Sequence, residues 1–154
     1  MKGLTWMVLL PAASLLGCMG SGNDPPALVT SENAAKLQTR QWALKSISTD
    51  GSQAVMDMQA NMTLVFGADG RVTGYGSVNR FNGAYSFSRD GKLSWPGPGF
   101  ITTRKAGPPE LMEKERAYLE ALPKTDRAIL QKHALQLENE GESTLLLFTE
   151  AGAP

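Results

Sequence analysis

The chain has 154 residues, the length of a single domain, and its apolar fraction of 42% is sufficient for a buried core. Lysine and arginine together number 15, as do aspartate and glutamate, so no overall positive charge attracts nucleic acid. Cys18 is the sole cysteine, which excludes an internal disulfide, a thiolate metal cluster and CxxC redox chemistry.

The N-terminal segment has the pattern of a secretory signal. Lys2 precedes an apolar stretch over Leu4–Leu16, which is too short to span a membrane. Residues 15–18 (L-L-G-C) resemble the bacterial lipobox, in which the cysteine receives diacylglycerol and becomes the first residue after cleavage. The alternatives are a plain signal peptide with a chance cysteine, or an uncleaved anchor. We predict a lipoprotein signal peptide over residues 1–17 and lipidation, including palmitate, at Cys18.

Residues 18–37 are expected to form a flexible tether. Small, polar and proline residues dominate this stretch, and they bury too little surface to offset the entropy lost on ordering. Met19 follows the cysteine, whereas aspartate at this position retains many lipoproteins at the inner membrane. The sequence therefore predicts a lipid-anchored protein of the bacterial cell envelope, attached to the outer membrane and facing the periplasm.

Residues 38–150 are expected to form the folded domain, and its first half consists of strands. Asp-Gly pairs at 50–51, 69–70 and 90–91 are typical of hairpin turns, so we expect a meander of antiparallel strands. A short helical turn over 33–38 precedes them. The expected strands are Gln41–Ile47, Met62–Phe66, Arg71–Gly76, Asn79–Ser88 and Lys92–Trp95.

One amphipathic helix is predicted over Glu110–Leu122. Pro109 suits the first turn of a helix, and apolar residues then recur at helical spacing. Glu115 falls inside this apolar stripe, and we interpret it as a partly buried acid or, more commonly, a paired structural carboxylate. Two or three further strands follow between residues 127 and 148. The apolar positions of the helix are Leu111, Tyr118, Leu119 and Leu122.

Glycines at 74, 76 and 83 interrupt the strand pattern, which indicates bulges or close backbone approach in a strongly curved sheet. Together with the element order, this predicts an α+β fold. Its curved, mostly antiparallel sheet resembles a cracked barrel and packs against the single helix.

Several segments, in order, resemble a known family. Residues 76–85 (G-S-V-N-R-F-N-G-A-Y) are similar to its signature G-x-C-N-x-F-x-G-x-Y, and residues 103–107 (T-R-K-A-G) to its T-x-M-A-C. W-A-L at 42–44, the hairpin over 66–74 and E-x-x-Y-L-x-x-L at 115–122 also match. The family is the META domain of HslJ-like heat-shock lipoproteins. The resemblance implies a role in stress tolerance, including resistance to some antibiotics, without a settled molecular activity.

Val78 and Gly107 stand where the family often has cysteines. Both cysteines are absent together, as expected if they pair in relatives, because the loss of one would leave a free thiol in an oxidising compartment. The resemblance therefore implies that Val78 and Gly107 lie close in space.

Candidate ligand- or partner-binding residues are Asn79, Arg80 and Arg104, which lie in the two signature segments. The arginines could grip a carboxylate or phosphate as a fork, although solvated or paired arginines are more common. Asn79 and Asn82 also suit turns. His133, the only histidine, is interpreted as a surface or edge residue.

No nucleophile, base and orienting group can be assembled from the sequence, and no phosphate loop or metal motif is present. We therefore predict a non-enzymatic protein with no catalytic residues, no cofactor and no metal. The lipid anchor supplies its membrane contact, and an envelope protein is the expected partner. The alternative is a carrier or chaperone for an apolar ligand or a partner's tail segment, similar to lipoprotein pilotins.

Overall fold

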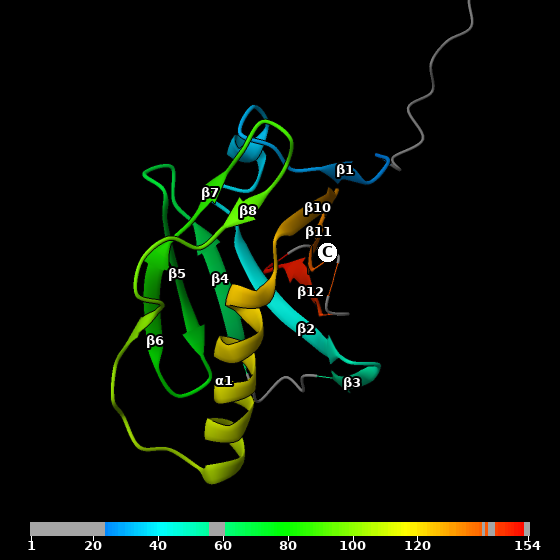
Figure 1. The fold of residues 1–154 in the computed structure, drawn as a ribbon. Helices are drawn as coiled ribbons and strands as arrows, with labels where there is room; N and C mark the ends of the chain where they lie inside the picture. The colour runs from blue at the N-terminus through cyan, green and yellow to red at the C-terminus, as the bar shows by residue number, and fades with distance from the viewer. Residues whose placement is uncertain (1–23, 56–60, 140, 142–143, 153–154) are drawn as a thin grey trace, which may run out of the picture.

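The computed structural model describes residues 24–55, 61–139, 141 and 144–152 (Figure 1). All pairs of named strands are antiparallel. The elements in chain order are β1 (Ala27–Leu28), η1 (Ala34–Lys36), β2 (Gln41–Thr49), β3 (Ser52–Val55), β4 (Met62–Phe66), β5 (Arg71–Gly76), β6 (Arg80–Ala84), β7 (Ser86–Phe87), β8 (Leu93–Ser94), β9 (Ile101–Thr102), α1 (Pro109–Ala121), η2 (Leu122–Lys124), β10 (Arg127–Gln131), β11 (Ala134–Glu138) and β12 (Leu145–Glu150).

The described strands form an open, ten-stranded sheet with β1 and β9 at its two ends. Their order is β1-β10-β11-β12-β2-β4-β5-β6-β9, with β3 paired to β2, while β7 and β8 form a separate hairpin. Figure 1 shows α1 in the bend of this sheet, with β4–β6 on one side of it and β10–β12 on the other. The predicted α+β fold with a mostly antiparallel sheet is therefore confirmed, and the sheet does not close into a barrel.

Tyr118 of α1 occupies the centre of the core. Its side chain is fully buried, and its ring contacts those of Phe81 and Phe148, with centroids 5.7 Å and 6.2 Å away. Its hydroxyl donates to the Thr63 carbonyl oxygen at 3.3 Å. Burial raises the pKa of the Tyr118 hydroxyl well above its usual value of 10.0. Aromatic side chains thus fill the space between the helix and the strands that it covers.

The predicted turns and helix are confirmed. Each of the three Asp-Gly pairs lies in a turn, and they connect β2 to β3, β4 to β5, and β7 to β8. The helix runs over Pro109–Ala121, with Pro109 in its first turn, and η1 forms within the predicted helical turn. Within the described part of the chain, no helix has both the length and the apolarity required to cross a bilayer.

Gly74 is needed because the chain approaches itself closely. A Cβ atom at this position would collide with the Thr63 carbonyl oxygen on β4 and with the Phe81 ring on β6. Phe81 is therefore able to lie over the β5 backbone and reach the core, where it is 2% exposed. The interpretation of this glycine as a site of close approach is correct.

The predicted tether ends too late in the chain. The structure pairs β1 with β10, and the Val29 amide donates to the Ala128 carbonyl at 2.8 Å. Val29 and Leu37 are buried in the core, and Trp42 Nε1 donates to the Leu37 carbonyl at 3.3 Å. Apolar burial and strand pairing therefore order residues 27–37, and the prediction is wrong for them. Residues 1–23, including Cys18 and the predicted signal peptide, lie outside the described part.

Candidate functional site

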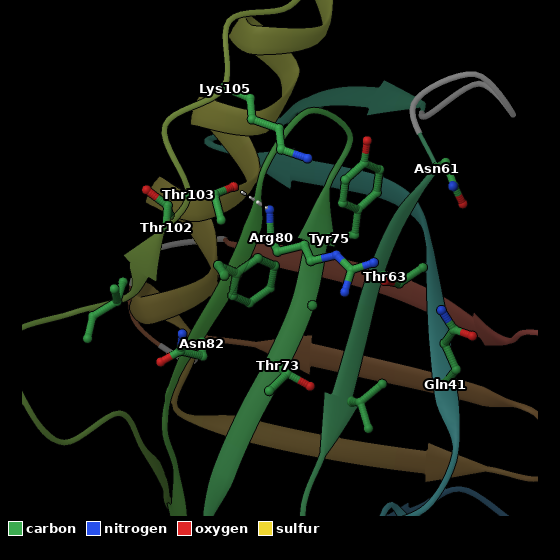
Figure 2. A pocket seen from close by; sticks show the side chains of 14 residues that line it. Gln41, Asn61, Thr63, Thr73, Tyr75, Arg80, Asn82, Thr102, Thr103 and Lys105 are labelled. Carbon is green, nitrogen blue, oxygen red and sulfur yellow. Dashed lines mark hydrogen bonds between the residues drawn. The ribbon is translucent and has the colours of Figure 1, made fainter.

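A polar groove of about 960 Å³ lies on the face of the sheet that points away from α1 (Figure 2). Because side chains alternate between the faces of a strand, the neighbours of the core residues on β2, β4, β5 and β6 point into it. The groove is lined by Gln41, Asn61, Thr63, Val65, Thr73, Gly74, Tyr75, Arg80, Phe81, Asn82, Ile101, Thr102, Thr103 and Lys105.

Strand register arranges these side chains in two rows that cross the strands. With strands about 4.8 Å apart, a row that crosses five strands is about 19 Å long, and the two rows are separated by about 7 Å along each strand. The first row consists of Gln41, Val65, Thr73, Asn82 and Ile101, and the second of Thr63, Tyr75 and Arg80. The groove is thus a shallow, regular surface rather than a deep cleft.

Arg80 and Lys105 make the groove positive. None of the described residues that line it is acidic. Figure 2 shows the guanidinium of Arg80 reaching across the face toward Thr63, and the amine of Lys105 directed toward Tyr75. Both side chains are exposed, and neither makes an ion pair or side-chain hydrogen bond with any residue that the structure describes. Two cations are thus available to an anionic ligand.

A buried Asn79–Glu115 pair lies beneath this cationic end of the groove. Oε2 of Glu115 accepts hydrogen bonds from the amides of Val78 at 3.0 Å and Asn79 at 2.6 Å, and Oε1 accepts from Asn79 Nδ2 at 2.8 Å. Glu115 is 7% exposed and Asn79 is 5% exposed. A Cβ atom at Gly76 would lie 2.7 Å from Cγ of Glu115, so glycine there admits the carboxylate. The pair connects α1 to the β5–β6 turn.

The same asparagine positions the two cations. Asn79 Oδ1 accepts from the Thr103 hydroxyl at 2.8 Å and from the Lys105 amide at 2.7 Å. The Thr103 hydroxyl oxygen in turn accepts from the Arg80 amide at 3.1 Å, as Figure 2 shows. The buried Asn79 side chain therefore fixes the backbone of Lys105 directly and the backbone of Arg80 through the Thr103 hydroxyl.

The predicted site residues occupy different environments. Arg80 lines the groove, Asn79 is buried under it and bonded to the chain, and Arg104 is exposed but is not among the lining residues. Asn82 lies in the first row. Glu115 is the paired, buried structural carboxylate that its place in the apolar stripe indicated.

Sequence reasoning missed Lys105, Gln41 and Thr73 as groove residues. Gln41 and Thr73 alternate with the core residues Trp42 and Val72, so period-two counting on both strands is the signal that could have found them. Lys105 gave no such signal, because it lies in a loop whose course depends on Asn79.

His133 is an exposed residue in the turn between β10 and β11. Its Nδ1 is 2.9 Å from Oε2 of Glu150, which also pairs with Arg40 at 3.4 Å. The hydrogen bond with His133 is the main cause that lowers the pKa of the Glu150 carboxyl, and Arg40 contributes to it. Among the described residues, no group of three or more histidine, cysteine or acidic side chains is placed to hold a metal ion.

Val78 and Gly107 are in contact, as the family resemblance implied. A Cβ atom built on Gly107 would lie 2.8 Å from both Val78 methyl groups and 3.4 Å from Val78 Cβ. This last separation is close to the Cβ–Cβ distance of a disulfide. The two positions therefore suit a cysteine pair.

We expect the double substitution Val78→Cys and Gly107→Cys, in a Cys18→Ala background, to form a disulfide under oxidising conditions. The bridge closes a loop of about 30 residues, for which chain entropy predicts a stabilisation of about 3.6 kcal/mol. Thiol titration and thermal unfolding with and without reductant measure both effects. Two free thiols after oxidation would contradict the geometry.

The comparisons with known proteins agree with this fold. A protein from Burkholderia xenovorans solved by NMR is 24% identical, with a TM-score of 0.66, and 99% of each chain is covered. A DUF4847 family protein from Bacteroides vulgatus is 14% identical, with a TM-score of 0.58 over 79% of this chain and 99% of its own. Another structure solved by NMR is 25% identical, with a TM-score of 0.55 over 80% and 96%.

No curated protein matches the chain. The family model of the META domain matches residues 35–152, which include all of the sheet except β1, and also α1 and the groove. The chain therefore belongs to the META domain family.

Proposed function

We propose that this META domain protein is a non-catalytic, lipid-anchored binding protein of the bacterial envelope. It contributes to stress tolerance by presenting its groove to an anionic partner. The observation that supports this role is the pair of cations, Arg80 and Lys105, on a polar surface whose described lining residues include no acid. Charged groups without partners in the protein favour an oppositely charged ligand and accelerate its encounter.

The proposed anchor and the cations of the groove lie toward opposite ends of the domain. Between Cys18 and β1 lie residues 19–26, a length of chain that extends at most about 28 Å. Figure 1 shows β1 at one end of the domain, and the beginnings of β6 and α1 at the other. Arg80 begins β6, and Lys105 precedes α1. A chain anchored through Cys18 thus holds β1 toward the bilayer and the cations away from it.

A binding role fits the chemistry of the groove better than catalysis. The lining residues that the structure describes offer amides, hydroxyls and two cations, and they include no histidine, cysteine or carboxylate that could act as a general base. The alternative of an apolar carrier gains no support from the space between α1 and the sheet, because Tyr118, Phe81 and Phe148 fill it.

Lipidation is tested with labelled palmitate in cells that express the wild-type chain or Cys18→Ala. We expect the label in the wild type and none in the variant, and we expect the wild type to fractionate with the outer membrane. Equal labelling of the two chains, or a wild-type protein found in the cytosol, would contradict the proposed anchor.

The binding surface is tested by photocrosslinking in intact cells. A benzoylphenylalanine is placed at Thr73, which is exposed in the first row, or at Glu113, which is exposed on α1. We expect a specific adduct at Thr73 and none at Glu113. Adducts at Glu113 alone would place the partner on the helix and overturn the groove as the binding surface.

A further inference from the structure

We infer that the ligand of the groove is an oligosaccharide that carries carboxylates. The inference rests on the proposed function, and it specifies the chemistry of the partner that the groove receives. Three features of the groove support it. These are the side chains that the central strands present, the mixture of amides and hydroxyls, and the placement of both cations at one end of the groove.

The centre of the groove offers a ligand side chains and no free backbone groups. It lies on the face of β4, β5 and β6, whose backbone groups are paired with neighbouring strands on both sides, while the edge strand β9 borders it through Ile101 and Thr102. An extended peptide gains much of its affinity from main-chain hydrogen bonds at a free sheet edge, which these three central strands do not offer. The surface therefore suits a ligand whose polar groups meet side chains.

The neutral part of the groove suits sugar hydroxyls. Gln41, Asn82 and Thr73 make no hydrogen bond through their side chains with the residues that the structure describes. An amide offers both donors and an acceptor, and a threonine hydroxyl offers both roles. A sugar hydroxyl also donates and accepts, so these three polar side chains of the first row, which Val65 and Ile101 complete, match the hydroxyl groups of a sugar chain. Tyr75 adds a half-buried aromatic surface in the second row.

The cationic part of the groove suits carboxylates. Arg80 lies in the second row, and Lys105 lines the same end of the groove (Figure 2). A guanidinium grips a carboxylate with two parallel hydrogen bonds, while an ammonium acts as a point charge. A ligand laid across the strands therefore meets neutral amides along one side and two cations along the other.

The test is calorimetric titration of the purified chain with tetragalacturonate, which carries a carboxylate on every sugar. The comparison ligands are cellotetraose, which has the hydroxyls without the charge, and tetraglutamate, which has the charge without the hydroxyls. We expect tetragalacturonate to bind at least tenfold more tightly than either. Binding of tetragalacturonate should weaken as salt is raised, because ion pairs at an exposed surface are screened.

Two variants separate the contributions of the rows. Arg80→Ala with Lys105→Ala removes the charges, and Gln41→Leu with Asn82→Leu removes the two amides of the first row at similar volume. We expect each pair of substitutions to lower the affinity for tetragalacturonate by about tenfold or more, since each leaves ligand groups without hydrogen-bond or charge partners. These side chains are exposed and have no partners among the described residues, so the thermal unfolding midpoint should stay near that of the wild type.

Three results would overturn the inference while the proposed function stands. Tetraglutamate that binds as tightly as tetragalacturonate would indicate an acidic peptide partner. Cellotetraose that binds as tightly would show that the cations are not used. If none of the three ligands binds but the Thr73 adduct still forms in cells, the inference is overturned and the anionic partner belongs to another chemical class. Absence of both binding and adduct would overturn the proposed function as well.

Discussion

Replacement of Glu115 with alanine is expected to lower the free energy of unfolding by about 3–5 kcal/mol. The substitution leaves the amides of Val78 and Asn79, and the side-chain amide of Asn79, without the acceptor they now share. In a domain of this size the unfolding midpoint should fall by roughly 10–20 °C. Thermal unfolding followed by circular dichroism measures the change.

The matched control is Glu113→Ala, on the exposed side of the same helix. A surface substitution of this kind should change stability by no more than about 0.5 kcal/mol. Glu115→Ala should also lower the affinity of the groove for its ligand. Glu115 holds Asn79, and Asn79 in turn positions the backbone of Arg80 and Lys105. Similar unfolding midpoints for the two variants would contradict a structural role for the buried carboxylate.

Gly74→Ala is expected to destabilise the chain by about 3 kcal/mol or more, because overpacking a well-filled site forces backbone and side chains to move. The added methyl group would meet the Thr63 carbonyl on one side and the Phe81 ring on the other. The carbonyl belongs to a central strand and cannot retreat without breaking its ladder. Chemical denaturation gives the change in free energy.

Gly141→Ala provides the comparison, since among the described residues its new Cβ would meet nothing closer than Asn139 Oδ1 at 3.5 Å. The free energy of unfolding of this variant should lie within about 1 kcal/mol of the wild-type value. If the methyl group displaces Phe81, the near-ultraviolet circular dichroism spectrum of Gly74→Ala should also change, because the Phe81 ring contacts both Tyr118 and Phe100. Two variants of equal stability would show that β5 and β6 accommodate the methyl group.

Local signals in the sequence predicted the elements whose formation depends on local interactions. The helix at Pro109–Ala121 follows from proline at its start and from apolar spacing, and the Asp-Gly turns follow from backbone preference. Glu115 was recognisable as unusual because a carboxylate inside an apolar stripe needs a partner when it is buried. Its partner, Asn79, could be named only from the structure.

Elements that depend on distant partners were not predictable in this way. β1 and β9 have two residues each, Val29 ends an apolar run of only three residues, and Leu37 stands between Lys36 and Gln38. Their burial follows from pairing with β10 and from contacts with the core. A bulge in β2 likewise shifts the register opposite Leu147 and Phe148 and breaks simple alternation.

The groove was only partly predictable, because it is a property of register. Its first row takes one residue from each of five strands, and their order along the chain does not reveal which ones are neighbours. Arg80 was found through the family signature, whereas Gln41 and Thr73 carry no signature and become site residues only through pairing.

Charge reversal tests most directly whether the two cations make this face the binding surface. With benzoylphenylalanine at Thr73, the chain carrying Arg80→Glu and Lys105→Glu should form the envelope adduct at about one tenth of the wild-type yield or less, because two attractive charges become repulsive. Its unfolding midpoint should remain near that of the wild type. An adduct of undiminished yield on the charge-reversed chain would contradict the account.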